Sequence, residues 1–297
     1  MKIKAWLNAF RLRTLPLALS SVLMGIVVAY IFGFVDIEIS IFSIITTTLL
    51  QILSNLANDY GDGIRGTDNE NRLGPMRTLQ SGKISPHEMR NAIILFSILS
   101  FLSGLYLLFL SHIDLFQIAI FLVLGLTAII AAITYTIGKK AYGYKGLGDI
   151  FVFLFFGLLA VLGTSYLISG EFNIYALFPA ASMGLFSTAV LNLNNLRDIE
   201  NDHFMGKKTI AVRLGVQKTK LYHTVLINLA FILLFLFVTL MELNWYIYLS
   251  FLVYVLFLID LLAIDRLQNL KKLDPFLKKT AIKTFVFVFI FILLVII

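Results

Sequence analysis

Two short clusters of acidic and amide side chains are the part of this sequence best suited to chemistry. Each cluster follows a long apolar segment, where carboxylates are costly and need a functional reason. The clusters are Asn55, Asn58, Asp59, Asp62 and Asp68, and Asn194, Asn195, Asp198 and Asp202. Mg²⁺ binds through a few hard oxygen ligands together with substrate phosphates. The two clusters therefore predict a site that holds magnesium and a diphosphate.

The spacing within each cluster places its members on one face of a helix, because residues three or four positions apart share a face. The residues concerned are Asn55, Asp59 and Asp62, with Asn58 at the edge of the face, and Asn194, Asp198 and Asp202. If the two helices face each other, four carboxylates converge on one cavity, and their repulsion requires divalent cations. A single acid at the end of a span is commonly a helix cap in headgroup water. Two matching clusters are poorly explained in that way.

Basic side chains interleave with these acids and predict contacts to phosphate. Arginine suits bidentate phosphate contacts, and lysine supplies a compact point charge. The candidate diphosphate-binding residues are Arg65, Arg77, Lys139, Lys140 and Arg197, and Arg72 stands in the same stretch. Further candidate site residues are Arg13, Lys207 and Tyr135, together with Asp68 as a candidate metal ligand. Tyr135 is included because an aromatic ring face can stabilise positive charge. The alternative for any one lysine is that it only sets the membrane topology.

The composition predicts an all-α, polytopic membrane helical bundle. Hydrophobic residues make up 59% of the chain and charged residues 14%, with a mean hydropathy of +0.92. A soluble domain cannot hide that much apolar surface. Apolar runs of about 18 residues or more predict nine transmembrane helices in a single domain over 1–297. We place them at 15–34, 40–58, 91–110, 116–137, 149–169, 174–196, 224–241, 245–264 and 281–297.

The distribution of charge predicts the orientation of the bundle. The 24 Lys and Arg residues lie at the N-terminus, in alternate loops or at the span ends beside them. By the positive-inside rule, the N-terminus is cytoplasmic and both acidic clusters face the cytoplasm. The net charge of +7 is thus a topology signal, since no basic soluble domain suited to nucleic acid is present. The absence of Cys excludes thiolate catalysis and cysteine metal sites.

Both clusters open long polar loops, between residues 58 and 91 and between 197 and 224. Loops of that length are often functional. The clusters are four predicted spans apart, which predicts two related four-helix halves plus a ninth helix. Ser85, Pro86 and Glu88 form a capping-box pattern, so we expect the third helix to begin near Pro86.

Six sequence stretches, in order along residues 11–215, carry a resemblance to a known family. They are RLRTLP at 11–16, NLANDYGDGIRGTD at 55–68, GPMRTLQSG at 74–82, YTIG at 135–138, GLGDIFVFLFFG at 146–157 and NNLRDIENDHFMGKKTIAVRLG at 194–215. The sequence resembles the UbiA superfamily of intramembrane prenyltransferases, and within it the MenA branch, the 1,4-dihydroxy-2-naphthoate polyprenyltransferases. The superfamily pattern NDxxDxxxD is matched up to its last position, where Gly66 stands, and Asp68 follows two residues later. The second pattern, DxxxD, is matched at Asp198 and Asp202.

The resemblance implies a nine-helix Mg²⁺-dependent prenyltransferase. Its implied catalytic residues, which hold two Mg²⁺ ions, are Asp59, Asp62, Asp198 and Asp202, with Asn55, Asn58 and Asn194 as further metal ligands. The implied donor is a polyprenyl diphosphate, and the implied acceptor is 1,4-dihydroxy-2-naphthoate, which loses CO₂ to give a demethylmenaquinone in menaquinone biosynthesis. The implied location is among the lipids of the bacterial cytoplasmic (inner) membrane, with the active site facing the cytoplasm.

Three alternatives are compatible with an acid-rich membrane protein. The same transfer could use another aromatic acceptor, such as 4-hydroxybenzoate or homogentisate. A cation-coupled transporter also places acids in its helices, but usually near the middle of the bilayer on broken helices. A lipid phosphotransferase of the CDP-alcohol type also uses aspartates and magnesium, but its DGxxAR signature is absent from this sequence.

Overall fold

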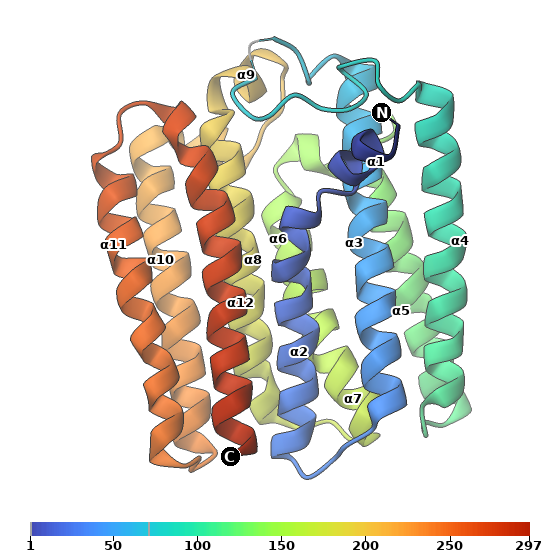
Figure 1. Cartoon of the computed structure of the whole chain (residues 1–297), viewed down its shortest axis with the longest axis vertical. Helices are drawn as coiled ribbons and strands as arrows, with labels where there is room; N and C mark the ends of the chain where they lie inside the picture. Colours follow the sequence, from blue (N-terminus) through green and yellow to red (C-terminus); the bar gives the residue numbers. More distant parts are fainter. Residues whose placement is uncertain (1, 71) are drawn as a thin grey trace.

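The chain folds into a bundle of long, roughly parallel and antiparallel helices (Figure 1). The computed structural model describes residues 2–70 and 72–297, and these ranges contain helices but no strand. Nine helical segments in the described ranges are long and apolar enough to cross a membrane. The predicted all-α membrane bundle with nine candidate spans is therefore confirmed.

Most spans consist of one α-helix, and two of them combine shorter pieces. The single helices are α2 (Leu15–Ile31), α3 (Ile37–Arg65), α4 (Pro86–Leu110), α5 (Leu115–Thr134), α8 (Leu177–Arg197), α10 (Ile210–Leu240) and α12 (Asp274–Ile296). The fifth span joins α6 (Gly148–Val152), the π-helical segment η3 (Phe153–Leu162) and α7 (Gly163–Ser169). The eighth joins a 3₁₀ segment (Trp245–Leu252) to α11 (Val253–Arg266).

Local capping interactions fix where the helices begin. The Ser85 hydroxyl accepts a hydrogen bond from the Glu88 backbone N–H, and the Glu88 carboxylate accepts one from the Ser85 N–H. This pair satisfies backbone donors that the first turn leaves free. The predicted start of the third long helix near Pro86 is confirmed.

Buried aromatic rings hold the second half of the bundle together. Phe186 of α8 packs edge-on against Phe231 of α10, with ring centroids 5.1 Å apart, and lies 5.6 Å from Phe257 of α11. Phe287 of α12 packs on Phe231 at 5.3 Å. Because such pairs pack in defined orientations, they fix the position of α8 and of the acidic cluster at its end.

Helices α3, α10 and α12 extend further than hydropathy predicts, and α12 begins at Asp274 rather than at residue 281. Helix α3 continues to Arg65, and α10 begins at Ile210 rather than at residue 224, with a break at Gly215 (φ 75°, ψ 170°). Hydropathy detects only the apolar part of a helix, whereas these helices continue into a polar region. The loops that follow the clusters are consequently shorter than predicted.

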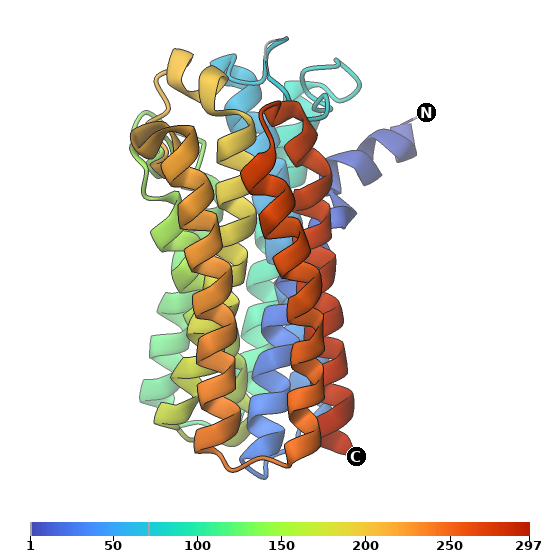
Figure 2. The same cartoon turned by 90° about the vertical axis from the view of Figure 1, so that its left-hand side faces the viewer.

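The loops around the two clusters meet at one end of the bundle. The loop after α3 and the short helix α9 (Ile199–Phe204) lie together there (Figure 1). At the same end, α1 (Lys2–Phe10) projects sideways from the bundle (Figure 2). The chain turns between α1 and α2 at Arg11, which has a left-handed backbone (φ 49°).

Candidate active site

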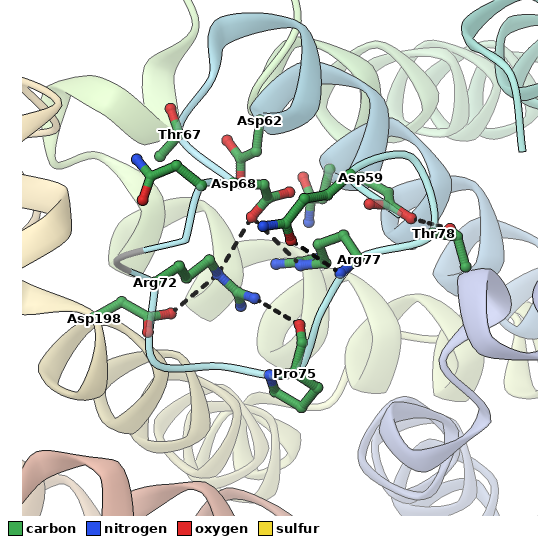
Figure 3. A network of polar contacts seen from close by, with 12 residues as sticks. Asp59, Asp62, Thr67, Asp68, Arg72, Pro75, Arg77, Thr78 and Asp198 are labelled. Carbon is green, nitrogen blue, oxygen red and sulfur yellow. Dashed lines mark hydrogen bonds and ion pairs between the residues drawn. The ribbon is translucent and has the colours of Figure 1, made fainter. Parts of the chain in front are cut away.

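The two acidic clusters form one polar network (Figure 3). Arg72, on the loop after α3, lies between them: its Nε is 3.2 Å from Asp68 Oδ1 and 3.4 Å from Asp198 Oδ2. Asn201 of α9 also donates a hydrogen bond of 2.9 Å to the Thr67 carbonyl. The two motifs thus lie in one network, with the loop as the element that joins them, but of the four aspartates predicted to converge on one cavity only Asp59 and Asp62 line it.

Two oxygens in this network are buried and have no partner among the described residues. They are Asp59 Oδ1 and Asp68 Oδ2, whereas Asp68 Oδ1 is ion-paired with Arg72 and Arg77. The other Asp59 oxygen accepts a hydrogen bond from the Thr78 hydroxyl. Buried acceptors are normally paired, so these oxygens fit a cation that the protein itself does not supply. The donor set, carboxylates and amides, is the one that Mg²⁺ prefers.

The carboxylates do not form an all-protein metal cage. No group of three or more carboxylate, histidine or cysteine side chains among residues 2–70 and 72–297 is arranged to hold a metal ion by itself. Magnesium usually keeps ligand positions for water and substrate phosphates and takes only one or two carboxylates. The geometry therefore suits an ion that binds together with a phosphorylated substrate.

The electrostatics of the site are dominated by the burial of its charged side chains. Burial and the nearby Asp62 raise the pKa of Asp68 to about 7, although Arg72 opposes the shift. Burial also raises the pKa of Asp202 to about 6, against the opposing effect of Lys207. Burial works to lower the pKa of Lys207, but Asp62 and Asp202 outweigh it and raise that pKa above its usual range. Cations are favoured at such a site.

Arg197 faces the protein interior rather than open space. Its guanidinium is fully buried and contacts both oxygens of Asp198, the side chain of Asn194, and Asp274 at the start of α12. Burial alone would raise the pKa of Asp198, but hydrogen bonding and charge from Arg197 reverse the shift and lower it. Arg197 therefore holds the end of α8 against α12 and orients Asp198.

We expect Arg197→Met to lower the free energy of unfolding by about 3–5 kcal/mol, because it leaves buried carboxylates without their partner. Thermal unfolding in detergent measures the effect. Arg266→Met is the matched control, because Arg266 is exposed at the end of α11 and should change little. Equal stability of the two variants would contradict the structural role of Arg197.

The other predicted basic residues occupy three different environments. Lys139 and Lys140 are exposed. Arg65 donates to the Gly138 carbonyl and lies over the Tyr144 ring, 4.3 Å from its centroid. Arg77 Nε is 3.6 Å from Asp68 Oδ1, and its buried Nη1 has no hydrogen-bond partner in the described part of the chain. Of these four, only Arg77 lies in the carboxylate network and also lines the cavity described next.

A cavity of about 840 Å³ begins at the carboxylates and continues along the bundle. Its polar end is lined by residues from both halves of the chain, including Asn55, Asn58, Asp59, Asp62, Arg77, Tyr135, Asn194 and Lys207, and Arg13 lies at its rim. Apolar side chains such as Leu107, Phe121 and Leu167 line the rest. A polar head joined to a long apolar body is the ligand shape that this cavity fits.

Sequence reasoning missed three side chains at the polar end. Tyr144 donates a 2.8 Å hydrogen bond to Asp62, and Lys207 lies 5.4 Å from the centre of its ring. Thr78 donates a hydrogen bond to Asp59, and Arg11 lines the cavity with a buried Nη2 that has no hydrogen-bond partner among residues 2–70 and 72–297. Arg11 and Thr78 stand in the stretches RLRTLP and GPMRTLQSG, so the family resemblance of those stretches could have pointed to them. No sequence pattern pointed to Tyr144.

The sequence matches the UbiA prenyltransferase family over residues 18–295. The chain belongs to the UbiA prenyltransferase family. A 1,4-dihydroxy-2-naphthoate octaprenyltransferase of Haemophilus influenzae is 46% identical over 251 residues, covering 84% of this chain and 81% of that protein. A 1,4-dihydroxy-2-naphthoate octaprenyltransferase of Escherichia coli is 46% identical, covering 80% and 77%. A UbiA homologue from Archaeoglobus fulgidus, solved with DMAPP and Mg²⁺, shares the fold with a TM-score of 0.66. The two chains are 19% identical, and the match covers 98% of this chain and 99% of the homologue.

This UbiA family member departs from the family pattern at Gly66, and the structure shows how the chain accommodates the change. Gly66 has φ 75° and ends α3, a backbone conformation that glycine adopts without strain. The chain then turns back, and the Thr67 and Asp68 N–H groups both donate to the Asp62 carbonyl. This turn directs Asp68 into the carboxylate network.

We expect Asp68→Asn to lower kcat/KM by about tenfold or more, because it removes one carboxylate from the buried network that we predict to bind Mg²⁺. The rate of prenyl transfer at several Mg²⁺ concentrations measures the effect. Glu70→Gln is the control, since Glu70 is exposed on the same loop. If Asp68→Asn behaves like Glu70→Gln, Asp68 has no part in the site.

Proposed function

We propose that this chain transfers a polyprenyl group from a polyprenyl diphosphate to 1,4-dihydroxy-2-naphthoate, with loss of CO₂ and diphosphate, as a step of menaquinone biosynthesis. The observation that carries the proposal is 46% identity, over more than four fifths of the chain, to an enzyme named for this reaction. The cavity supports it independently, because a polar, carboxylate-lined end continues into an apolar channel.

In this proposal, Asp59, Asp62, Asp198 and Asp202 hold two Mg²⁺ ions, and Asn55, Asn58 and Asn194 complete the ligand set. Bound magnesium neutralises the negative charge that grows on the departing diphosphate. Arg77 and Lys207 add charge at the same end, because both line the cavity beside the carboxylates. Arg72 and Arg197 act on the carboxylates themselves.

The reaction begins when the bond between the allylic carbon and the diphosphate oxygen breaks and the electron pair leaves with the diphosphate. The electron-rich naphthoate ring forms a carbon–carbon bond to the allylic carbocation. The ring then loses its carboxylate as CO₂, and the electron pair of that bond restores the aromatic ring. Tyr135 and Tyr142 line the cavity with rings 5.3 Å apart, and their faces can stabilise the cation. The apolar wall keeps water from quenching it.

The active site is proposed to face the cytoplasm of a bacterial inner membrane. The carboxylate network lies at one end of the bundle (Figure 1). Most Lys and Arg residues fall in the sequence segments that form this end, which supports a cytoplasmic orientation by the positive-inside rule. The same position argues against a cation-coupled transporter, whose ion sites usually lie near the middle of the bilayer.

The proposal is tested by incubating the purified protein in nanodiscs with octaprenyl diphosphate, Mg²⁺ and one acceptor at a time, followed by mass spectrometry. The acceptors are 1,4-dihydroxy-2-naphthoate, 4-hydroxybenzoate and homogentisate. We expect a decarboxylated, prenylated naphthoquinol with the first acceptor only, and its loss on addition of EDTA. If product forms with 4-hydroxybenzoate or homogentisate but not with 1,4-dihydroxy-2-naphthoate, that acceptor would replace the naphthoate in the proposal. No product with any acceptor would overturn it.

A further inference from the structure

Four glycines in the spans are explained by close helix packing. A Cβ added to Gly25 would lie 2.7 Å from the Val161 carbonyl oxygen, and one added to Gly61 would lie 2.4 Å from the Thr136 hydroxyl. A Cβ added to Gly157 would lie 2.6 Å from the Gly184 Cα, and one added to Gly184 would lie 2.7 Å from the Phe153 ring. Small residues commonly let membrane helices approach this closely. At these four positions the absence of a side chain allows neighbouring helices to pack closely.

Gly104 of α4 and Gly125 of α5 have no such explanation. A Cβ added to either would have nothing within 4 Å. A glycine inside a helix is less favourable than alanine, so a glycine that close packing does not explain needs another reason. Neither glycine has a positive φ, so neither is required by the backbone.

Both glycines line the cavity, Gly104 at a half-buried position of α4 and Gly125 at an exposed position of α5. One turn to either side of Gly104, Ser100 and Leu108 also line it, and Phe121 and Ile129 do so around Gly125. The same cavity continues to Asp59 and Asp62 at its polar end. Ser43, which lines its deep end, is about 24 Å from Asp59 along α3 at a rise of about 1.5 Å per residue. The glycines therefore leave room along the path from the carboxylates into the apolar channel.

We propose that Gly104 and Gly125 determine the length of the prenyl chain that this protein accepts, by leaving space for the distal isoprene units of the donor. This inference rests on the proposed prenyl transfer. The occupant is the donor tail rather than a membrane lipid, because the space is continuous with the site proposed for the diphosphate. A short donor ends before the two glycines, whereas a long donor must pass them.

The test compares wild type, Gly104→Leu and Gly125→Leu with geranyl, geranylgeranyl and octaprenyl diphosphate and a fixed acceptor. We expect kcat/KM with the octaprenyl donor to fall about tenfold or more in the leucine variants, because the new side chain occupies tail space. With the geranyl donor we expect less than about a twofold change. Gly125→Ala should be close to wild type with every donor, since a single methyl group meets open space.

Ala119→Leu is the matched control, because Ala119 is exposed on α5 and does not line the cavity. Equal losses with short and long donors, or no loss with any donor, would overturn the proposal. Equal losses would mean that the leucines disturb the fold or the polar site, and no loss would mean that another molecule, such as a lipid chain, fills the space. Failure of the proposed function is distinguishable, because wild type would then give no prenylated product with any donor.

Discussion

Asp59→Asn is expected to lower kcat by at least about 100-fold while the protein still folds. The substitution keeps the shape of the side chain, and the amide oxygen can still accept the hydrogen bond from Thr78. It removes the charge from a buried group whose Oδ1 has no partner within the described protein. If that oxygen binds magnesium with the donor diphosphate, the loss falls on the step in which diphosphate departs. Single-turnover rates in detergent or nanodiscs, with product detected by mass spectrometry, measure the effect.

Asp114→Asn is the control for the Asp59 variant. Asp114 is exposed and caps α5 through the Gln117 N–H, a role that asparagine also fills. We expect this variant to retain nearly full activity. Near wild-type turnover in Asp59→Asn would contradict the assignment of the α3 carboxylates as metal ligands.

Lys207→Gln is expected to lower kcat/KM by about 100-fold. Lys207 is buried, lines the cavity, and lies 3.9 Å from Asp202 and 5.4 Å from the centre of the Tyr144 ring. In the proposed reaction its charge stabilises the negative charge that develops on the leaving diphosphate, and glutamine cannot supply that charge. Steady-state kinetics with varied donor concentration measure the loss.

The neighbouring Lys208 provides the matched control, because its side chain is exposed. Lys208→Gln should leave kcat/KM within about twofold of wild type, as expected for a surface charge screened by water and salt. Equal effects of the two substitutions would show that only the overall charge of the loop matters. A normal rate in Lys207→Gln would remove Lys207 from the site.

Periodicity and charge were sufficient to predict the helical bundle and the meeting of the two acidic motifs. Helical spacing placed Asp59 and Asp62 on one face of α3. Because carboxylates beside apolar spans are energetically costly, two such clusters indicated a shared functional site. Span ends were less predictable, because hydropathy does not register the polar continuation of α10 before residue 224. The π-helical segment in the fifth span has no counterpart in the hydropathy pattern.

The direction of each basic side chain could not be read from local sequence. Arg197 is next to Asp198 in the chain, which made a phosphate contact plausible, but its guanidinium turns to Asp274 on a helix distant in sequence. From sequence alone Lys207 was a weaker candidate than Arg197 for the diphosphate site, and yet Lys207 lines the cavity. Such choices depend on contacts between distant segments, which one sequence does not display.

The central claim is that motifs from both halves of the chain form one magnesium-dependent diphosphate site. It is tested most directly by calorimetric titration of an unreactive thio-diphosphate analogue of the donor into wild type, Asp59→Asn and Asp198→Asn, with and without Mg²⁺. We expect binding to wild type to require Mg²⁺ and to weaken by about tenfold or more in both variants. Unchanged Mg²⁺-dependent binding in either variant would contradict a single shared site.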